Sequence, residues 1–447
     1  MSAAIVVGAG AGGLVAAWQF ARAGWSVTLL DAWRRPGGLL GRADLHGLAL
    51  DVGAESYSVR GGAVAALLAE LGASDLIEHP NPLGAWLHAT DGAHPIPKGL
   101  VFGLPSDIEA ADVRAVVGDV PPARRPERAG SFADLVRAEY GQRVLDDLVT
   151  PLVGGVYSTD PQRVTLAELA PGLADQVAGG VPLREAVQRA AAGASAGGAA
   201  VHGIRGGMHV LGDLLVSAAE QTGRFELACD EPALAVVDEG TTWRVRTSRR
   251  ELSAPALVLA VPLDVAARLL GAPVSPSTTR VEVITLMLDA PALRGDEPRG
   301  TGVLVGAGVP GVVAKALTHS TAKWAWLRAA AQGRDVLRLS YGRRGQAPAT
   351  AGLDQAELAR LAHRDAVALL GRPVPPPAAV YRTSWSILTA GTPGLAPARQ
   401  WLTERRTARL GLVGAGVAGV GLAAVVPQAR AEAVRLLQRS GTHENDA

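Results

Sequence analysis

The chain opens with short apolar runs separated by glycine turns. Residues 3–7 form an apolar run rich in β-branched side chains, and residues 8–13 read Gly-Ala-Gly-Ala-Gly-Gly. The next segment, 14–23, has the composition of a buried helix, which Gly24 is expected to end. Residues 26–30 then alternate like a buried strand. The pattern predicts a βαβ unit with a tight turn after its first strand.

The residue types in this turn match the needs of a dinucleotide site. Gly8 permits the turn, Gly10 lets backbone N–H groups approach a pyrophosphate, and Gly13 allows the helix to pack close to the strand. Asp31 closes the second strand, 23 residues after Gly8. A carboxylate there is expected to accept hydrogen bonds from a ribose hydroxyl, which favours an adenosine without a 2′-phosphate.

A second glycine turn, residues 414–419, follows the apolar run 410–413 near the end of the chain. Only 33 residues follow Gly414, too few for a second strand and a second ribose-binding acid. We therefore expect a last strand and helix that return to the first domain, with the helix N-terminus pointing at the same cofactor.

The rest of the chain predicts a divided α/β protein. Residues 79–200 are punctuated by proline and mostly helical in pattern, residues 283–341 alternate as strands, and residues 224–260 suggest an antiparallel strand set. We expect a discontinuous Rossmann-like domain, a largely helical substrate or membrane-facing region, and a mixed-sheet substrate domain. Their predicted bounds are 1–78, 201–275 and 400–440 for the first, 79–200 for the second, and 276–399 for the third.

Composition narrows the choice of function. Among 447 residues, 43 Lys and Arg balance 42 Asp and Glu, so the net charge of +1 makes nucleic acid a poor partner. The single cysteine, Cys229, excludes a disulfide scaffold and a CxxC redox centre. The nine histidines form no HxH or HxxxH pair, so no metal site is expected.

Two uncharged stretches could be mistaken for membrane segments. Residues 1–21 lack the basic region that a signal peptide needs, and glycines together with Pro427 interrupt residues 410–429. We expect a cytoplasmic protein without a transmembrane segment.

Several motifs resemble known flavoproteins. The opening VVGAGAGGLVAAWQFARAGWSVTLLDA, RRPGG at 34–38 and DVGAES at 51–56 are similar to the FAD-binding half of the amine-oxidase-like superfamily. Four further segments, taken in order and spacing, resemble the soluble bacterial FAD-dependent coproporphyrinogen III oxidases. These are HPIPKG at 94–99 with GLPSD after it, PLVGGVYSTDP at 151–161, IRGGM at 204–208 and KALTHSTAKW at 315–324.

The resemblance implies FAD as cofactor and a set of residues around it. It assigns the pyrophosphate to Gly8, Ala9, Gly10, Ala11, Gly12 and Gly13, and the adenosine ribose to Asp31 and Ala32. It places Gly38 and Leu39 near the flavin, and Gly53, Ala54, Glu55 and Ser56 at the isoalloxazine face. It assigns the adenine contact to Ala233, and the contact of the closing helix with the flavin to Val420, Gly421 and Leu422.

The three lysines of the chain, Lys98, Lys315 and Lys323, all lie in these motifs. Lys98 is a candidate contact for a substrate propionate, and a solvated lysine in a turn is the alternative. No catalytic acid or base can be named. The chain also departs from the family, since GTPGLAPARQWLTERR at 391–406 stands where relatives carry Pro-Gln-Tyr and Gly-His.

The reaction that the resemblance implies is the six-electron oxidation of coproporphyrinogen III to coproporphyrin III in haem biosynthesis, with O2 as acceptor and H2O2 as product. It implies a tetrapyrrole and O2 as small-molecule partners and product hand-off to a ferrochelatase. Alternatives are a protoporphyrinogen IX oxidase, another amine-oxidase-like flavoprotein, or a flavin- or haem-binding protein without activity. Peripheral membrane contact stays open because the substrates are amphipathic, although no basic amphipathic helix stands out.

Overall fold

The computed structural model describes residues 2–124, 130–193, 201–293 and 298–441. The chain divides into two compact units. The first combines Met1–His79, Ala199–Ser277 and Pro393–Ala447, and the second combines Pro80–Gly198 and Thr278–Thr392. Each unit therefore contains segments that are far apart in the sequence. Both contain helices and sheets, and the predicted α/β class is confirmed.

A five-stranded parallel sheet forms the centre of the first unit. Its strand order is β12-β2-β1-β16-β22. The strands are β1 (Ala3–Val7), β2 (Ser26–Leu30), β12 (Phe225–Ala228), β16 (Ala256–Leu259) and β22 (Leu410–Leu412). The last strand of the chain thus lies in the same sheet as the first, which confirms that the C-terminal segment returns to the first domain.

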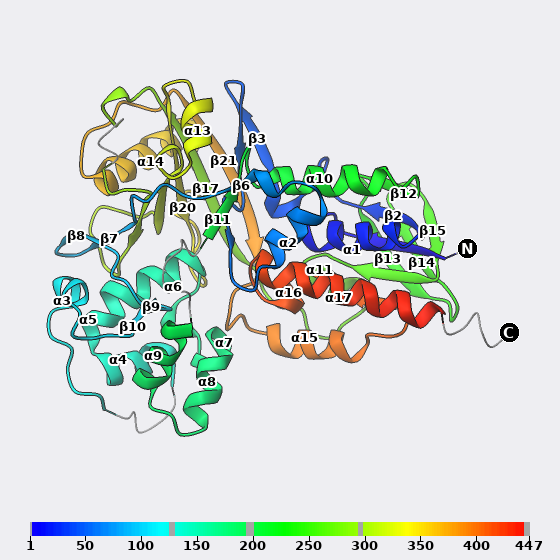
Figure 1. The fold of residues 1–447 in the computed structure, drawn as a ribbon, viewed down its shortest axis with the longest axis horizontal. Helices are drawn as coiled ribbons and strands as arrows, with labels where there is room; N and C mark the ends of the chain where they lie inside the picture. The colour runs from blue at the N-terminus through cyan, green and yellow to red at the C-terminus, as the bar shows by residue number, and fades with distance from the viewer. Residues whose placement is uncertain (1, 125–129, 194–200, 294–297, 442–447) are drawn as a thin grey trace. The chain divides into compact units, whose positions relative to one another are not determined.

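Three long helices cover this sheet. They are α1 (Ala11–Arg22), α10 (His209–Glu220) and α17 (Leu422–Gly441), and Figure 1 shows α1 between the other two. Their apolar faces share one core with β1 and β2, in which Phe20, Leu211 and Val426 are fully buried. Burial of this apolar surface holds the turn between β1 and α1 in place.

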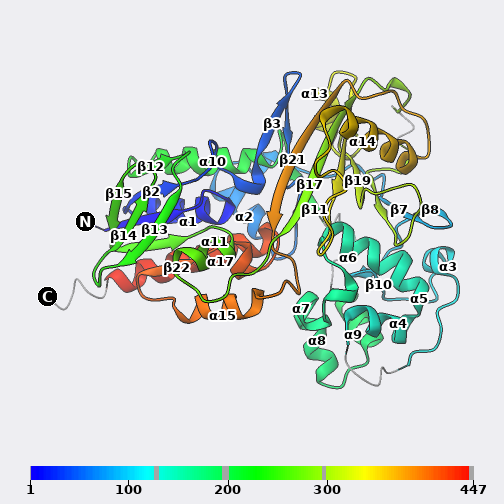
Figure 2. The ribbon, with the colours of Figure 1, turned by 180° about the vertical axis from the view of Figure 1, so that it is seen from behind.

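Smaller elements complete the first unit. Figure 2 shows the antiparallel strands β13 (Ala233–Asp238), β14 (Trp243–Thr247) and β15 (Glu251–Ala254) beside the parallel sheet. The predicted antiparallel set over 224–260 is correct only for these three. Its first and last strands, β12 and β16, join the parallel sheet, and the four residues of β16 are fully buried, as a strand covered on both faces requires.

The remaining elements of the first unit are short strands and helices. They are β3 (Arg42–Leu45), β4 (Leu48–Asp51), β5 (Tyr57–Ser58), β6 (Ile77–Glu78), β11 (Val201–Ile204), α2 (Ala63–Glu70), α11 (Leu263–Leu269), α15 (Leu395–Glu404) and α16 (Ala415–Ala418). Strands β3 and β4 form a hairpin, and β11 lies between β5 and β6.

The second unit contains a seven-stranded mixed sheet of order β21-β17-β20-β19-β18-β7-β8. Helix α14 (Gln355–Leu370) packs on it, begins at a capping box of Asp354 and Glu357, and ends at Gly371, whose φ is +69°. The strands are β7 (Trp86–Ala89), β8 (Gly92–Pro95), β17 (Thr279–Leu288), β18 (Gly302–Val305), β19 (Ala316–His319), β20 (Asp335–Tyr341) and β21 (Ala379–Ile387).

Helices of the second unit begin later than the sequence suggests. In the predicted helical region 79–200, residues 86–105 instead form β7, β8, β9 (Leu100–Val101) and β10 (Leu104–Pro105). Proline and glycine interrupt this stretch, which leaves room only for short strands. Residues 194–200 lie outside the described residues.

The helices of this region surround a core of their own. They are α3 (Ala111–Val117), α4 (Phe132–Tyr140), α5 (Gln142–Val144), α6 (Thr150–Val156), α7 (Leu166–Leu169), α8 (Pro171–Ala178) and α9 (Leu183–Gly193), and α12 (Ser320–Lys323) and α13 (Ala325–Ala330) follow β19.

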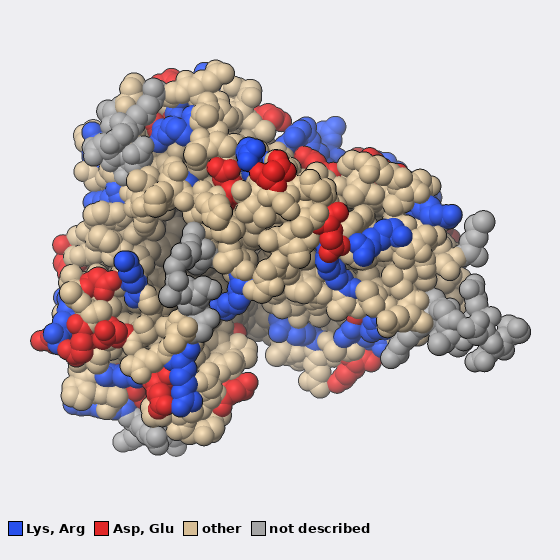
Figure 3. Space-filling model, viewed as in Figure 1, with Lys and Arg blue, Asp and Glu red and all other residues tan. Residues whose placement is uncertain are grey.

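In the described ranges, no helix is long and apolar enough to cross a membrane. Acidic and basic side chains are interspersed over the face that Figure 3 shows, in keeping with the net charge of +1.

Candidate functional site

The turn between β1 and α1 is crowded at two of its glycines. Gly8 has a φ of +102°, and a Cβ atom there would lie 2.6 Å from the carbonyl oxygen of Ala260. A Cβ atom on Gly13 would lie 1.8 Å from the carbonyl oxygen of Gly8. Neither position accepts a side chain, because Gly8 lies against the backbone that follows β16 and Gly13 lies against the turn itself.

The same turn is open at Gly10. This residue precedes α1, with no side chain capping the helix, and no atom lies within 4 Å of the place where its Cβ atom would be. The unpaired N–H groups of the first helical turn make the N-terminus of a helix favourable for an anion. The open side of Gly10 therefore suits a phosphate group.

Asp31 lies at the same edge of the sheet. Val7 of β1 and Leu30 of β2 are register partners, so Gly8 and Asp31 follow them side by side. The Asp31 carboxylate accepts hydrogen bonds from the N–H of Ala9, at 2.6 Å, and from that of Trp33, at 2.7 Å. Burial raises the pKa of Asp31, and these backbone bonds offset only part of the rise.

Two further predicted segments reach this turn. Gly37 donates its N–H to the carbonyl of Ala9 at 2.8 Å, and a Cβ atom on Gly38 would lie 3.2 Å from the Cα of Gly10. A Cβ atom on Gly53 would lie only 2.2 Å from the carbonyl oxygen of Leu39. The segments around 8–13, 37–39 and 53–54 therefore form one continuous backbone surface.

The second glycine turn lies against the first. A Cβ atom on Gly12 would meet the Cα of Gly414 and the side chain of Val425, both at 3.3 Å. Positions Gly419 and Gly421 have φ values of +95° and +96° and open space beside them. The beginning of α17 thus adjoins the beginning of α1.

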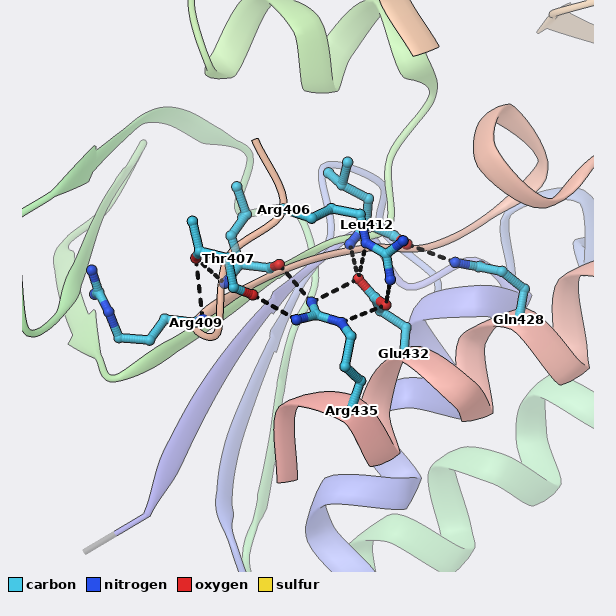
Figure 4. A network of polar contacts seen from close by, with 8 residues as sticks. Arg406, Thr407, Arg409, Leu412, Gln428, Glu432 and Arg435 are labelled. Atoms are coloured by element: carbon cyan, nitrogen blue, oxygen red, sulfur yellow. Dashed lines mark hydrogen bonds and ion pairs between the residues drawn. The ribbon is translucent and has the colours of Figure 1, made fainter. Parts of the chain in front are cut away.

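A buried ion-pair network holds this last strand and helix together. Glu432 of α17 is 2 % exposed and accepts hydrogen bonds from Arg406, from Arg435 and from the N–H of Leu412 (Figure 4). Burial by itself would raise the pKa of Glu432, but the bonds from Arg435, Arg406 and Leu412 bring it below its usual value. The network fixes where α17 starts relative to β22.

Sequence reasoning missed one pair in the first unit. Asp51, the last residue of β4, accepts hydrogen bonds from the N–H groups of Met208 and His209 at 2.8 and 3.2 Å, and lies 3.1 Å from His209 Nδ1. A Cβ atom on Gly207 would lie 2.9 Å from the same carboxylate. The motifs DVGAES and IRGGM therefore meet. The available signal was the pair Gly206 and Gly207, which lies one residue before α10.

Other predicted residues lie elsewhere in their units. Ala233 is the first residue of β13 and pairs with Thr247 next to a bulge. Lys98 belongs to the second unit, in an exposed turn after β8, and its backbone N–H donates to Asp112 at 2.9 Å. Over the described residues, no group of three or more His, Cys, Asp or Glu side chains could hold a metal ion.

Comparison with known proteins shows the family to which the chain belongs. A family model described as flavin containing amine oxidoreductase matches residues 11–437. This chain belongs to that family. As a member, it is an oxidoreductase with FAD as cofactor.

The relatives of this flavoenzyme include coproporphyrinogen III oxidases. That of Mycobacterium tuberculosis is 31% identical over 444 residues, which cover 94% of each chain, and that of Mycobacterium leprae is 32% identical over 384 residues, covering 79% of this chain and 80% of the relative.

Solved structures of low identity share the fold. A protein of Exiguobacterium sp. 255-15, provisionally named a protoporphyrinogen oxidase, superposes with a TM-score of 0.78 at 23% identity, over 98% of this chain and 99% of that one. A putrescine oxidase bound to putrescine gives a TM-score of 0.66 at 15% identity, over 100% and 99% of the two chains.

The geometry of the first unit fits the ADP part of FAD. An open helix N-terminus at Gly10 suits the pyrophosphate, and a carboxylate at the end of β2 suits the ribose diol. Backbone atoms crowd Gly8 and Gly13, whereas the space beside Gly10 is open, so a phosphate group would lie beside Gly10.

Proposed function

We propose that this flavoenzyme oxidises coproporphyrinogen III to coproporphyrin III. The macrocycle loses six electrons and six protons in three two-electron steps, and three molecules of O2 take them up as three H2O2. FAD, when bound, supplies the redox chemistry by accepting a hydride equivalent in each step and returning the electrons to O2. The reaction belongs to haem biosynthesis.

The extended similarity to the mycobacterial coproporphyrinogen III oxidases carries this proposal. A match of 31% identity spans 94% of both chains, so it includes the second unit as well as the flavin unit. The segments 94–99, 151–161 and 315–324, which resemble this family, all lie in the second unit.

The role of the chain is to bind and orient the cofactor. We assign the pyrophosphate to Gly8–Gly13, the ribose to Asp31 and Ala32, the flavin to Gly38, Leu39, Gly53, Ala54, Glu55 and Ser56, the adenine to Ala233, and the closing contact to Val420, Gly421 and Leu422. Asp51 acts as a positioning residue, since it joins the strand before Gly53 to the beginning of α10. Backbone groups that are already held in place reduce the entropy lost when the cofactor and the substrate are oriented for reaction.

Aerobic turnover of the FAD-loaded protein tests the reaction. We expect coproporphyrin fluorescence to rise with coproporphyrinogen III, with about three H2O2 formed for each porphyrin, because each step is a two-electron transfer. A protein that is yellow with FAD but produces neither porphyrin nor peroxide would show that the substrate assignment is wrong.

Lys98 is our candidate for a substrate propionate. Its exposed ammonium group can form a charge-assisted hydrogen bond with a carboxylate. Lys98→Gln is expected to raise KM for coproporphyrinogen III several-fold at low salt with kcat nearly unchanged, and Lys98→Arg is expected to keep most of the affinity. Equal KM values for all three proteins would leave Lys98 as a solvated turn residue.

A protoporphyrinogen IX oxidase is the second candidate. It is favoured by the provisional name of the Exiguobacterium structure and by a local match to Arabidopsis protoporphyrinogen oxidase 2, which is 27% identical over 180 residues and 38% of this chain. The cytoplasm as location and transfer of the product to a ferrochelatase are further predictions of the coproporphyrinogen assignment.

A further inference from the structure

The second unit buries a lysine that the proposed flavin site does not use. Lys315 directly precedes β19 and is 2 % exposed. Its ammonium group donates a hydrogen bond to the hydroxyl of Ser158, which is itself 6 % exposed. Two segments that are 157 residues apart in the chain thus meet at this contact.

Ser158 adopts a conformation that is uncommon for a residue with a side chain. Its φ is +54°, in the left-handed region, and its carbonyl accepts the N–H of Arg344 at 3.2 Å. Non-glycine residues in this region cost free energy and are enriched at functional sites. The strained backbone holds the Ser158 hydroxyl against the lysine.

A second cation, the half-buried Arg343, lies nearby. Arg343 follows β20, and its Nε is buried and has no hydrogen-bond partner among the residues that the structure describes. It packs against Gly154, where a Cβ atom would lie 3.3 Å from this nitrogen. Gly154 therefore leaves room for the guanidinium group beside helix α6.

Among the described residues, these two cations form no close ion pair with a carboxylate, and the charge of Asp160 offsets only part of the effect of burial on the pKa of Arg343. Within the described part of the chain, neither Lys315 nor Arg343 forms an ion pair, and Asp160 is directed to Arg163 at 3.7 Å. Burial lowers the pKa of both groups, and the neighbouring Arg343 charge helps to bring the pKa of Lys315 to about 7. Buried like charges are costly unless an anion compensates them.

Lys315 and Arg343 also line a cavity. Its volume is about 270 Å³, and its other walls come from the loop after β18 and the loop after β20, including Gly306, Gly308 and Gln346. This volume is below the range typical of drug-sized ligands, and it suits a small anion or one acidic arm of a larger molecule.

We propose that this cavity binds an oxyanion, a carboxylate or a phosphate, between Lys315 and Arg343. A guanidinium group offers a planar fork that matches two oxygens, and an ammonium group adds a point charge. The group has two sources: a free small anion, or an acidic substituent of a larger ligand such as the substrate. Only the second source rests on the proposed function.

Thermal unfolding of the FAD-loaded protein tests the site with succinate and with inorganic phosphate, each titrated at constant ionic strength. We expect a saturable rise in Tm of a few degrees in the wild type, because a ligand that binds only the folded state stabilises it. The rise should be lost in Lys315→Met and in Arg343→Met, and kept in Arg343→Lys. Arg360→Met, which removes an exposed charge of the same unit, is the matched control and should respond like the wild type.

A second arm separates the two sources with coproporphyrin III as probe. If the porphyrin abolishes the succinate response of the wild type, the acidic group comes from the larger ligand; if both responses add, the anion is free. A protein without coproporphyrinogen turnover can still show the succinate response, so the two proposals fail independently.

The site would be overturned if the wild type responded to neither anion, or if Arg343→Met responded as strongly as the wild type. The arginine variants decide it even if Lys315→Met does not fold.

Discussion

At the scale of single residues, the flavin unit distinguishes glycines that cannot carry a side chain from one that can. Gly8 and Gly13 are crowded by backbone atoms at 2.6 and 1.8 Å, whereas Gly10 has free space and an ordinary backbone conformation. Substitutions at these sites should therefore affect the stability of the apoprotein and its affinity for FAD differently.

Gly10→Ala is expected to leave the free energy of unfolding of the apoprotein nearly unchanged and to weaken FAD binding at least tenfold, because its methyl group would occupy the space assigned to the pyrophosphate. Gly13→Ala should destabilise the apoprotein as well. FAD titration by fluorescence and urea unfolding of both variants provide the measurement. Normal FAD affinity in Gly10→Ala would contradict the placement of the pyrophosphate.

Lys315 should give stability a recognisable dependence on pH. Its pKa is about 7 in the folded protein and near its usual 10.5 in the unfolded chain. Between these values the unfolded chain binds the extra proton, so the free energy of unfolding should rise with pH. The stability of the wild type relative to Lys315→Met, measured by urea unfolding from pH 6 to pH 10, is expected to increase above pH 7. A difference that does not change with pH would refute this expectation.

At the scale of elements, one buried carboxylate contributes to the position of α17, in addition to its apolar packing. Glu432 bonds to Arg406, Arg435 and the N–H of Leu412, and these contacts join α17 to β22 and to the loop before it (Figure 4). Loss of this charge removes one of the connections that place the second glycine turn beside α1, while the bonds of Gln428 to Gly414 and Leu412 remain.

Glu432→Gln should lower the free energy of unfolding by about 2 kcal/mol at neutral pH, as expected when buried charged hydrogen bonds are broken. Because the pKa of Glu432 lies below its usual value, its contribution is present above about pH 4.5 and is lost as the pH falls through the folded pKa. Urea unfolding at pH 7 and pH 4 checks both points. The exposed Glu404→Gln serves as control, and an equal effect of the two substitutions would argue against the role of the network.

Local patterns predict the elements that depend on nearby residues. The βαβ unit and its glycine spacing can be read from about 30 consecutive residues. Strands β7 and β8 were missed because each has only four residues. Strand β7 is stabilised by pairing with β18, which is more than 200 residues away, and β8 pairs with β7. The contacts of Asp51 with His209 and of Ser158 with Lys315 join distant segments, so sequence spacing gave no sign of them.

At the scale of the whole molecule, the central claim concerns the substrate. The fold alone does not choose between amines and porphyrinogens, since a putrescine oxidase shares it at 15% identity. Similarity to coproporphyrinogen III oxidases over 94% of the chain is the observation on which our choice of a porphyrinogen rests.

The most direct test is the ratio of kcat/KM for coproporphyrinogen III to that for protoporphyrinogen IX, measured aerobically on the FAD-loaded protein. Coproporphyrinogen III has four propionates and protoporphyrinogen IX has two, so a site built for the former should lose at least tenfold in kcat/KM with the latter. We predict a ratio well above one. A ratio at or below one would contradict the assignment and identify the enzyme as a protoporphyrinogen oxidase.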